Sequence, residues 1–99
     1  MTTRIRRSGG NVFRDLGFAR EEAENLKIRS DLMIRLGKLI EARGLTQARA
    51  ASLFAVTQPR ISDLMRGKIE RFSIDTLVAM LGQAGVRVDI TVRRTPKVA

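Results

Sequence analysis

The chain has 99 residues, enough for one domain with a single modest core, and 43% of them are hydrophobic but only 4% aromatic. Its 19 Lys and Arg residues against 10 Asp and Glu residues give a net charge of +9, which favours a polyanionic partner such as nucleic acid over a merely basic solubility surface. Cys and His are absent, which excludes a disulfide framework, a thiolate zinc site and an imidazole general base.

The first 18 residues divide into a basic arm and a short hydrophobic segment. Residues 1–10 contain three arginines and end in Ser-Gly-Gly, which is typical of a linker that is flexible or orders against a partner. Residues 11–18 are too short and glycine-broken for a long helix, yet they carry four apolar side chains: Val12, Phe13, Leu16 and Phe18. We expect this segment to fold back and bury them on the domain's own core.

A long helix is predicted over residues 19–43, or two helices with a break near Ser30. Its core stripe recurs at helical spacing and consists of Leu26, Met33, Leu36, Leu39 and Ile40. Three glutamates near the start and Arg43 near the end suit the helix dipole, and Gly44 ends the helix.

Residues 46–67 predict two short helices joined by a tight turn. Thr46 can cap the first helix, which should end near Ala55. Thr57 can cap the second, Pro59 is tolerated in its first turn, and Gly67 can end it in the left-handed conformation. The core-facing residues are Ala50, Leu53 and Phe54 in the first helix, Val56 in the turn, and Ile61 and Leu64 in the second helix.

This pattern resembles the helix-turn-helix of the XRE, or lambda repressor/Cro-like, family of bacterial DNA-binding proteins. A plain helical hairpin with a solvated polar face is the alternative. The resemblance runs from about Asn11 to Arg93 and is closest to HigA-type antitoxins, which often carry a segment like SQPRISDLxRGK followed by FS and a C-terminal strand. It rests on Thr46-Gln47, Ala50-Ala51, Phe54, Val56, residues 58–64 (QPRISDL) and Gly67.

Beyond the helix-turn-helix, Lys68 and Arg71 extend a basic ridge, and Ser73 can cap a further helix that runs to about Gln83. Apolar residues then alternate strictly with polar ones in a predicted half-buried strand, at Val86, Val88, Ile90 and Val92. An isolated strand would leave its backbone groups unpaired, so it needs a partner. The simplest partner is the same strand of a second copy; residues 2–7 of the same chain are the alternative.

The expected fold is therefore mainly α, a lambda-repressor-like helix-turn-helix bundle with one C-terminal β-strand that pairs across a homodimer. We divide it into residues 1–18 (arm and hydrophobic segment), 19–85 (helical domain, with the helix-turn-helix at 46–67) and 86–99 (strand and tail). Such a dimer would place two recognition helices about 34 Å apart on an inverted-repeat operator in double-stranded DNA.

The DNA contacts predicted from the motif divide into reading and positioning. For base reading we expect Gln58, Arg60, Ser62 and Asp63, with Arg60 suited to guanine and Gln58 to adenine. Asp63 could accept from cytosine or orient an arginine. The proline at position 59 departs from relatives that carry a polar residue there, which leaves the base code open. Phosphate contacts are expected from Gln47, Arg49, Thr57, Arg66, Lys68 and Arg43.

The resemblance implies a cytoplasmic bacterial repressor that autoregulates its operon as the antitoxin of a toxin-antitoxin pair. The toxin would resemble RelE or HigB, and the apolar residues of 12–18 could contact it. A free-standing XRE-family regulator without a toxin is the alternative. An RNA-binding protein is a further possibility, but this chain lacks the aromatic and glycine signatures of the common RNA modules. We predict no enzyme activity, since Gly37-Lys38 and Gly67-Lys68 lack the rest of a P-loop. We also predict no cofactor, metal, membrane contact or small-molecule substrate.

Overall fold

A computed structural model of the chain describes residues 12–94 and the backbone of residues 2–5. The linker at 8–10 and the tail at 95–99 lie outside the described residues. The helices are α1 (Val12–Asp15), α2 (Arg20–Ala42), α3 (Gln47–Phe54), α4 (Gln58–Met65) and α5 (Ile74–Gln83), with a 3-10 turn, η1 (Ile69–Arg71), and the strands are β1 (Thr2–Ile5) and β2 (Arg87–Ile90). The mainly helical fold expected from the sequence is confirmed.

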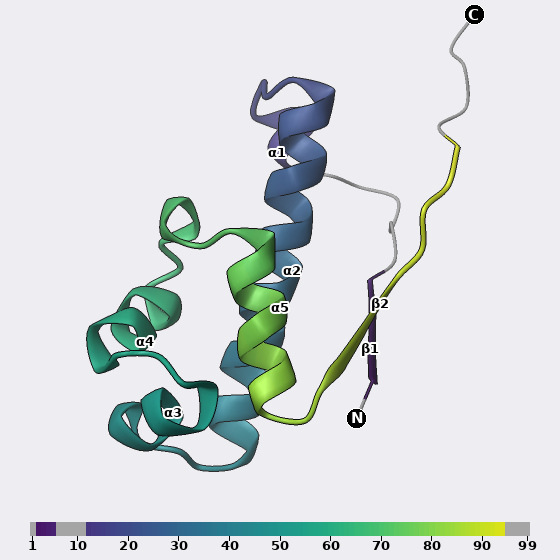
Figure 1. Cartoon of the computed structure of the whole chain (residues 1–99). Coiled ribbons are helices and arrows are strands. Elements are labelled where there is room, and N and C mark those ends of the chain that lie inside the picture. The colour runs from purple at the N-terminus through teal and green to yellow at the C-terminus, as the bar shows by residue number, and fades with distance from the viewer. Residues whose placement is uncertain (1, 6–11, 95–99) are drawn as a thin grey trace, which may run out of the picture.

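The long helix α2 runs through the middle of the fold, and α3, α4 and α5 pack around its second half (Figure 1). It continues for 23 residues with no break near Ser30. All five residues of its expected apolar stripe are buried. Met33, Leu36, Leu39 and Ile40 form one core with Phe54, Ile61, Phe72 and Leu77 from the later elements. Because these residues come from five separate segments, the core holds α4 in a defined orientation on α2.

The expectation that residues 12–18 bury their apolar side chains is wrong. The segment forms the single turn α1, in which no residue is buried, and Val12, Leu16 and Phe18 are 57%, 69% and 38% exposed. Phe13 is half-buried, and its ring meets that of Phe18 edge-to-face with centroids 6.2 Å apart. The segment packs against the N-terminal end of α2 (Figure 1) and adds no residue to the buried core.

The C-terminal strand also differs from the expectation. Strand β2 pairs in parallel with β1 of the same chain, in the register Thr2 with Arg87 through Ile5 with Ile90, so the same-chain alternative describes this structure and the pairing across a dimer does not. Parallel neighbours require a long crossover connection, and here the helices provide it. The alternation is only half satisfied, because Val86 is buried and Val88 half-buried, whereas Ile90 is 52% and Val92 88% exposed.

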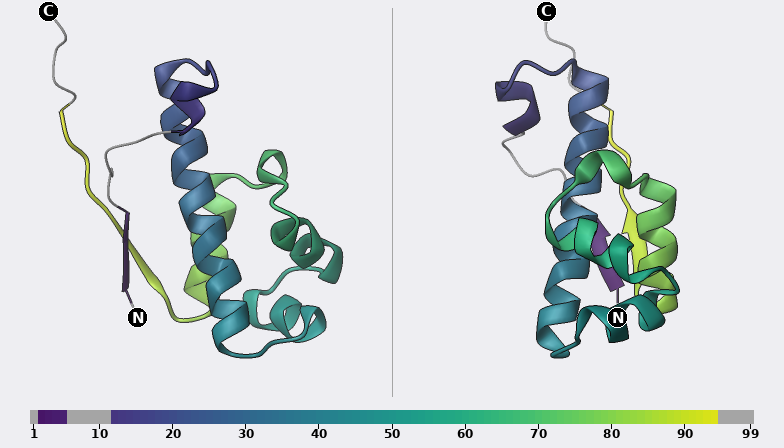
Figure 2. Two further views of the ribbon diagram at one scale, coloured as in Figure 1. Left: turned by 180° about the vertical axis from the view of Figure 1, so that it is seen from behind. Right: turned by 90° about the vertical axis from the view of Figure 1, so that its left-hand side faces the viewer.

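The two-stranded sheet and the helix-turn-helix lie on opposite sides of the layer formed by α2 and α5. Figure 1 shows α3 and α4 on one side and the strands on the other, and the left-hand view of Figure 2 agrees. Helix α5 contacts both sides, since it packs against α3 and against β2. The outward face of α4 is therefore remote from the sheet.

Candidate nucleic-acid interface

Helices α3 and α4 are each capped at the N-terminus by a local hydrogen bond. The Thr46 hydroxyl accepts from the Arg49 backbone N–H at 3.1 Å, and the Thr57 hydroxyl accepts from the Arg60 N–H at 3.4 Å. Between the helices Ala55 adopts the left-handed conformation, with φ of 57°, which ends α3 and redirects the chain. Both predicted caps and the predicted end of α3 are confirmed. The two-residue turn that follows gives α3 and α4 a fixed angle.

Burial separates α4 into an inner and an outer face. Ile61 and Leu64 are buried against the core, as predicted, and Val56 in the preceding turn is half-buried. On the outer side Gln58 and Arg66 are exposed and Ser62 is half-buried. The side chains of these three residues make no hydrogen bond or ion pair with any residue that the structure describes. They are thus available to an external ligand.

Arg60 lies on the flank of α4 and is engaged within the chain. Its guanidinium carbon is 5.2 Å from the centroid of the Phe72 ring, a cation–π arrangement, and its Nη1 donates to the backbone carbonyl of Arg71 at 3.1 Å. Phe72 itself is buried. Reading guanine through a guanidinium edge that includes Nη1 would require Arg60 to give up the contact with Arg71.

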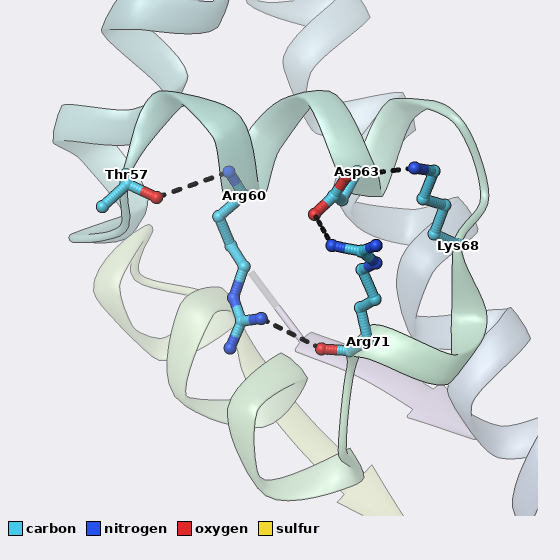
Figure 3. Close-up of polar contacts among 5 residues, drawn as sticks. All are labelled: Thr57, Arg60, Asp63, Lys68 and Arg71. Atoms are coloured by element: carbon cyan, nitrogen blue, oxygen red, sulfur yellow. Dashed lines mark hydrogen bonds and ion pairs between the residues drawn. The ribbon is translucent and has the colours of Figure 1, made fainter.

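Asp63, one turn further along the same flank, is also engaged. One carboxylate oxygen lies 3.4 Å from Nη1 of Arg71 and the other 3.7 Å from Nζ of Lys68 (Figure 3). The Asp63 side chain is 19% exposed, whereas those of Lys68 and Arg71 are 34% and 54% exposed. The carboxylate therefore holds two cations beside α4 while their outer surfaces stay in solvent.

The residues expected to bind phosphate fall into two groups. Gln47, Arg49 and Arg66 are exposed. The other three are already engaged. Lys68 is half-buried and pairs with Asp63, the Thr57 hydroxyl caps α4, and Arg43 Nη2 donates to the Ala84 carbonyl at 3.5 Å, which ties the end of α2 to the end of α5. Arg49 belongs to α3, Arg66 is the C-cap of α4, and Lys68 and Arg71 belong to the segment that follows.

Sequence reasoning did not identify the contacts that Arg71 and Phe72 make with α4. They join residues eight to twelve positions apart across the turn at Gly67, so no local pattern reports them. The spacing of Arg60 and Asp63 was a usable signal, since residues three apart in a helix share a side. Because Ile61 and Leu64 face the core and directly follow Arg60 and Asp63, that side borders the core and is not the outermost face of α4.

Most of the apolar residues predicted for partner contacts are exposed. Val12, Leu16 and Phe18 are exposed on and after α1, and Ile90 and Val92 are exposed in and after β2. A mainly apolar groove of about 400 Å³ lies between α1, α2, α4 and η1, and Phe13, Met33, Ile34, Leu64 and Met65 are among its lining residues.

Two kinds of site were sought within residues 12–94 and were not found there. No cluster of three or more acidic side chains in this range could hold a metal ion. No helix described by the structure is long and apolar enough to cross a membrane.

Comparison with known proteins gives a consistent result. A family model described as a helix-turn-helix domain matches residues 12–93. A solved structure assigned to the XRE family of transcriptional regulators is similar, with 31% sequence identity and a TM-score of 0.70, over 79% of this chain and 88% of the other. No curated protein sequence matches the chain.

Proposed function

We propose that this chain, which belongs to the XRE helix-turn-helix family of DNA-binding transcription regulators, is a repressor that recognises a specific sequence in double-stranded DNA. The observation that carries the proposal is the outer face of α4. The side chains of Gln58, Ser62 and Arg66 make no hydrogen bond or ion pair with any described residue. Two cations flank the helix in the chain, Arg49 on α3 before it and Lys68 in the segment after it. Docked in a major groove, this face would meet base edges while the cations meet the flanking phosphates.

The division of labour within this surface follows from side-chain chemistry. Gln58, at the start of α4, can make a paired contact with the N6 and N7 of adenine, and Ser62 can accept from or donate to either base of a pair. Arg49 and Lys68 carry positive charge before and after α4, where contacts to phosphates would release counterions. Gln47 and the backbone N–H groups at the start of α3 add neutral donors for a phosphate. Affinity should therefore fall steeply with salt, while sequence preference should depend on α4.

A homodimer is the second part of the proposal. Ile90 and Val92 lie on the same face of the strand as Val86 and Val88 but are exposed, whereas Val86 is buried and Val88 half-buried. This end of the strand therefore offers apolar area to a second copy. An open sheet edge also leaves backbone donors and acceptors for a partner strand. Two copies would present two α4 helices to successive major grooves of an inverted repeat.

Footprinting on the DNA upstream of the chain's own reading frame tests the regulator proposal. We expect one protected inverted repeat, with a binding constant that falls as a power of the salt concentration. Protection spread evenly over the fragment, or tighter binding to single-stranded RNA than to the duplex, would contradict it.

We propose further that the repressor acts in the bacterial cytoplasm as the antitoxin of a RelE- or HigB-like toxin encoded beside it. The exposed apolar residues Val12, Leu16 and Phe18 support this, because they offer an apolar surface on and after α1 that a protein partner would cover. Co-expression of the tagged chain with the product of the adjacent reading frame tests it. A stable complex that is lost on Leu16→Lys is expected, whereas a chain that purifies alone and still binds its DNA would favour a free-standing regulator.

A further inference from the structure

The segment between α4 and α5 is held in place by side chains from two helices. From α2, Arg29 Nη1 donates to the carbonyls of Ile69 and Phe72 at 3.1 and 3.4 Å. From α4, Arg60 donates to the carbonyl of Arg71, and Asp63 pairs with the guanidinium of the same residue (Figure 3). Arg71 is therefore held at both its backbone and its side chain by α4.

We infer that Arg60 and Asp63 act as positioning residues that latch residues 68–72 to the flank of α4, and that the latched Lys68 and Arg71 bind the DNA backbone. This inference rests on the proposed function and refines it. The base-reading role then belongs to Gln58, Ser62 and Arg66. Arg71 becomes a DNA contact alongside the residues expected from the motif.

The charge arrangement favours positioning over reading for Asp63. A carboxylate in the major groove is suited to cytosine N4, but an unpaired one would repel the nearby phosphates. Asp63 instead faces two cations and keeps only a fifth of its side chain exposed, at 19%. The pair of cations outweighs its charge, so the cluster stays net positive toward DNA.

Burial and bonding favour the same role for Arg60. Its guanidinium packs on a buried ring and donates to a backbone carbonyl, so both its face and one edge are occupied. Guanine recognition needs a free guanidinium edge with two donors directed at O6 and N7. In this geometry Arg60 instead sets the distance between α4 and the cations at 68–72.

The test is a double-mutant cycle on the protected duplex found by footprinting, together with a set of duplexes that each carry one substituted base pair. Binding is measured by fluorescence anisotropy at several salt concentrations for Asp63→Asn, Arg71→Gln, the double variant of these two, and Arg60→Gln. Asp31→Asn is the matched control, because it removes one carboxylate from a lysine pair at 2.8 Å on α2, away from the proposed interface. Thermal unfolding followed by circular dichroism establishes that each variant is folded.

The expected results concern slope, coupling and base preference. Relative to Asp31→Asn, the Asp63→Asn change should weaken duplex binding about tenfold and make the logarithmic salt slope shallower by about 1 to 2, because released cations contact phosphate less often. Arg71→Gln should make the slope shallower by about 1. The fold-loss of duplex affinity in the double variant should be smaller than the product of the fold-losses in the two single variants. The relative effect of each substituted base pair should match the wild type in every variant, Arg60→Gln included.

Other outcomes overturn the inference. Loss of discrimination at a single base pair in Asp63→Asn or Arg60→Gln would make that residue a base reader. An unchanged salt slope in the folded Arg71→Gln variant, or independent effects of the two changes, would remove the latch. A wild-type chain that prefers no duplex sequence would overturn the proposed function itself, which the variants alone cannot do.

Discussion

The two sides of the α2–α5 layer differ in how completely the chain buries its own apolar side chains and pairs its own polar groups. On the helix-turn-helix side, both helices are capped, their apolar faces are buried, and the flank of α4 is bonded to the segment that follows. On the opposite side and at α1, Leu16, Ile90 and Val92 remain exposed. This chain therefore completes its helix-turn-helix unit alone, whereas its remaining apolar surface is left open to other protein chains.

The largest difference should appear in stability. Phe54 on α3 is 1% exposed in the core, so Phe54→Ala should lower the free energy of unfolding by about 3–5 kcal/mol through lost burial and a residual cavity. Phe18, after α1, is 38% exposed, and we expect Phe18→Ala to cost about 1 kcal/mol or less. Urea unfolding measures both. Equal losses would mean that residues 12–18 belong to the same cooperative core.

The next effect concerns the exposed side of the sheet. Val92 is 88% exposed, so Val92→Lys removes almost no contact within the chain and should leave the unfolding of a monomer unchanged. If a second copy buries this side chain, the charge should weaken the dimer by about 2 kcal/mol, or roughly 30-fold in dissociation constant. Light scattering over a concentration series measures the change. A variant with an unaltered dimer would place the interface elsewhere.

A change on the outer face of α4 should affect recognition and leave stability alone. Gln58 is exposed and has no partner among the described residues, so Gln58→Ala should cost about 1–3 kcal/mol in binding to the operator and relax discrimination at one position. Arg87→Ala on β2 is a control that also removes an exposed polar side chain, 80% exposed, from the other side of the molecule. Uniform weakening on all duplexes would make Gln58 a phosphate contact instead.

The turn of the helix-turn-helix should carry a small stored strain. Ala55 adopts φ of 57°, a region that glycine enters without the steric penalty of a Cβ. Ala55→Gly should therefore stabilise the fold by up to about 1 kcal/mol, whereas the same replacement at exposed Ala48 in α3 should destabilise it by about 1 kcal/mol. Thermal unfolding should show changes in stability of opposite sign for the two variants if the turn is strained, and of the same sign if it is not.

How far the sequence predicted the structure follows the same division. Caps at Thr46, Thr57 and Ser73 and the apolar stripe of α2 were predicted correctly, because they depend on residues within one or two turns. The burial of residues 12–18 was predicted wrongly, because apolar composition does not say whether a core lies within reach. The alternation at 86–92 identified a strand but not its partner, since period two specifies a face and not a neighbour.

The candidate site shows the same limit at finer scale. Helical spacing placed Ile61 and Leu64 inside and so indicated which face of α4 points outward. It could not show that Arg60 and Asp63 are held by Arg71 and Phe72, because that contact depends on how residues 68–72 return to the helix. The base-reading and phosphate-binding residues accordingly remain predictions for the binding experiments.

The most direct test of the central claim is an anisotropy titration of the wild-type chain with its footprinted duplex and with a scrambled duplex of the same composition, near physiological salt. We predict binding at least about a thousandfold tighter to the footprinted sequence, as is usual for specific DNA-binding proteins, and loss of most of that preference when Gln58, Ser62 and Arg66 are all replaced by alanine. Equal affinity for the two duplexes, or an unchanged preference in the triple variant, would contradict the assignment of α4 as the reading element.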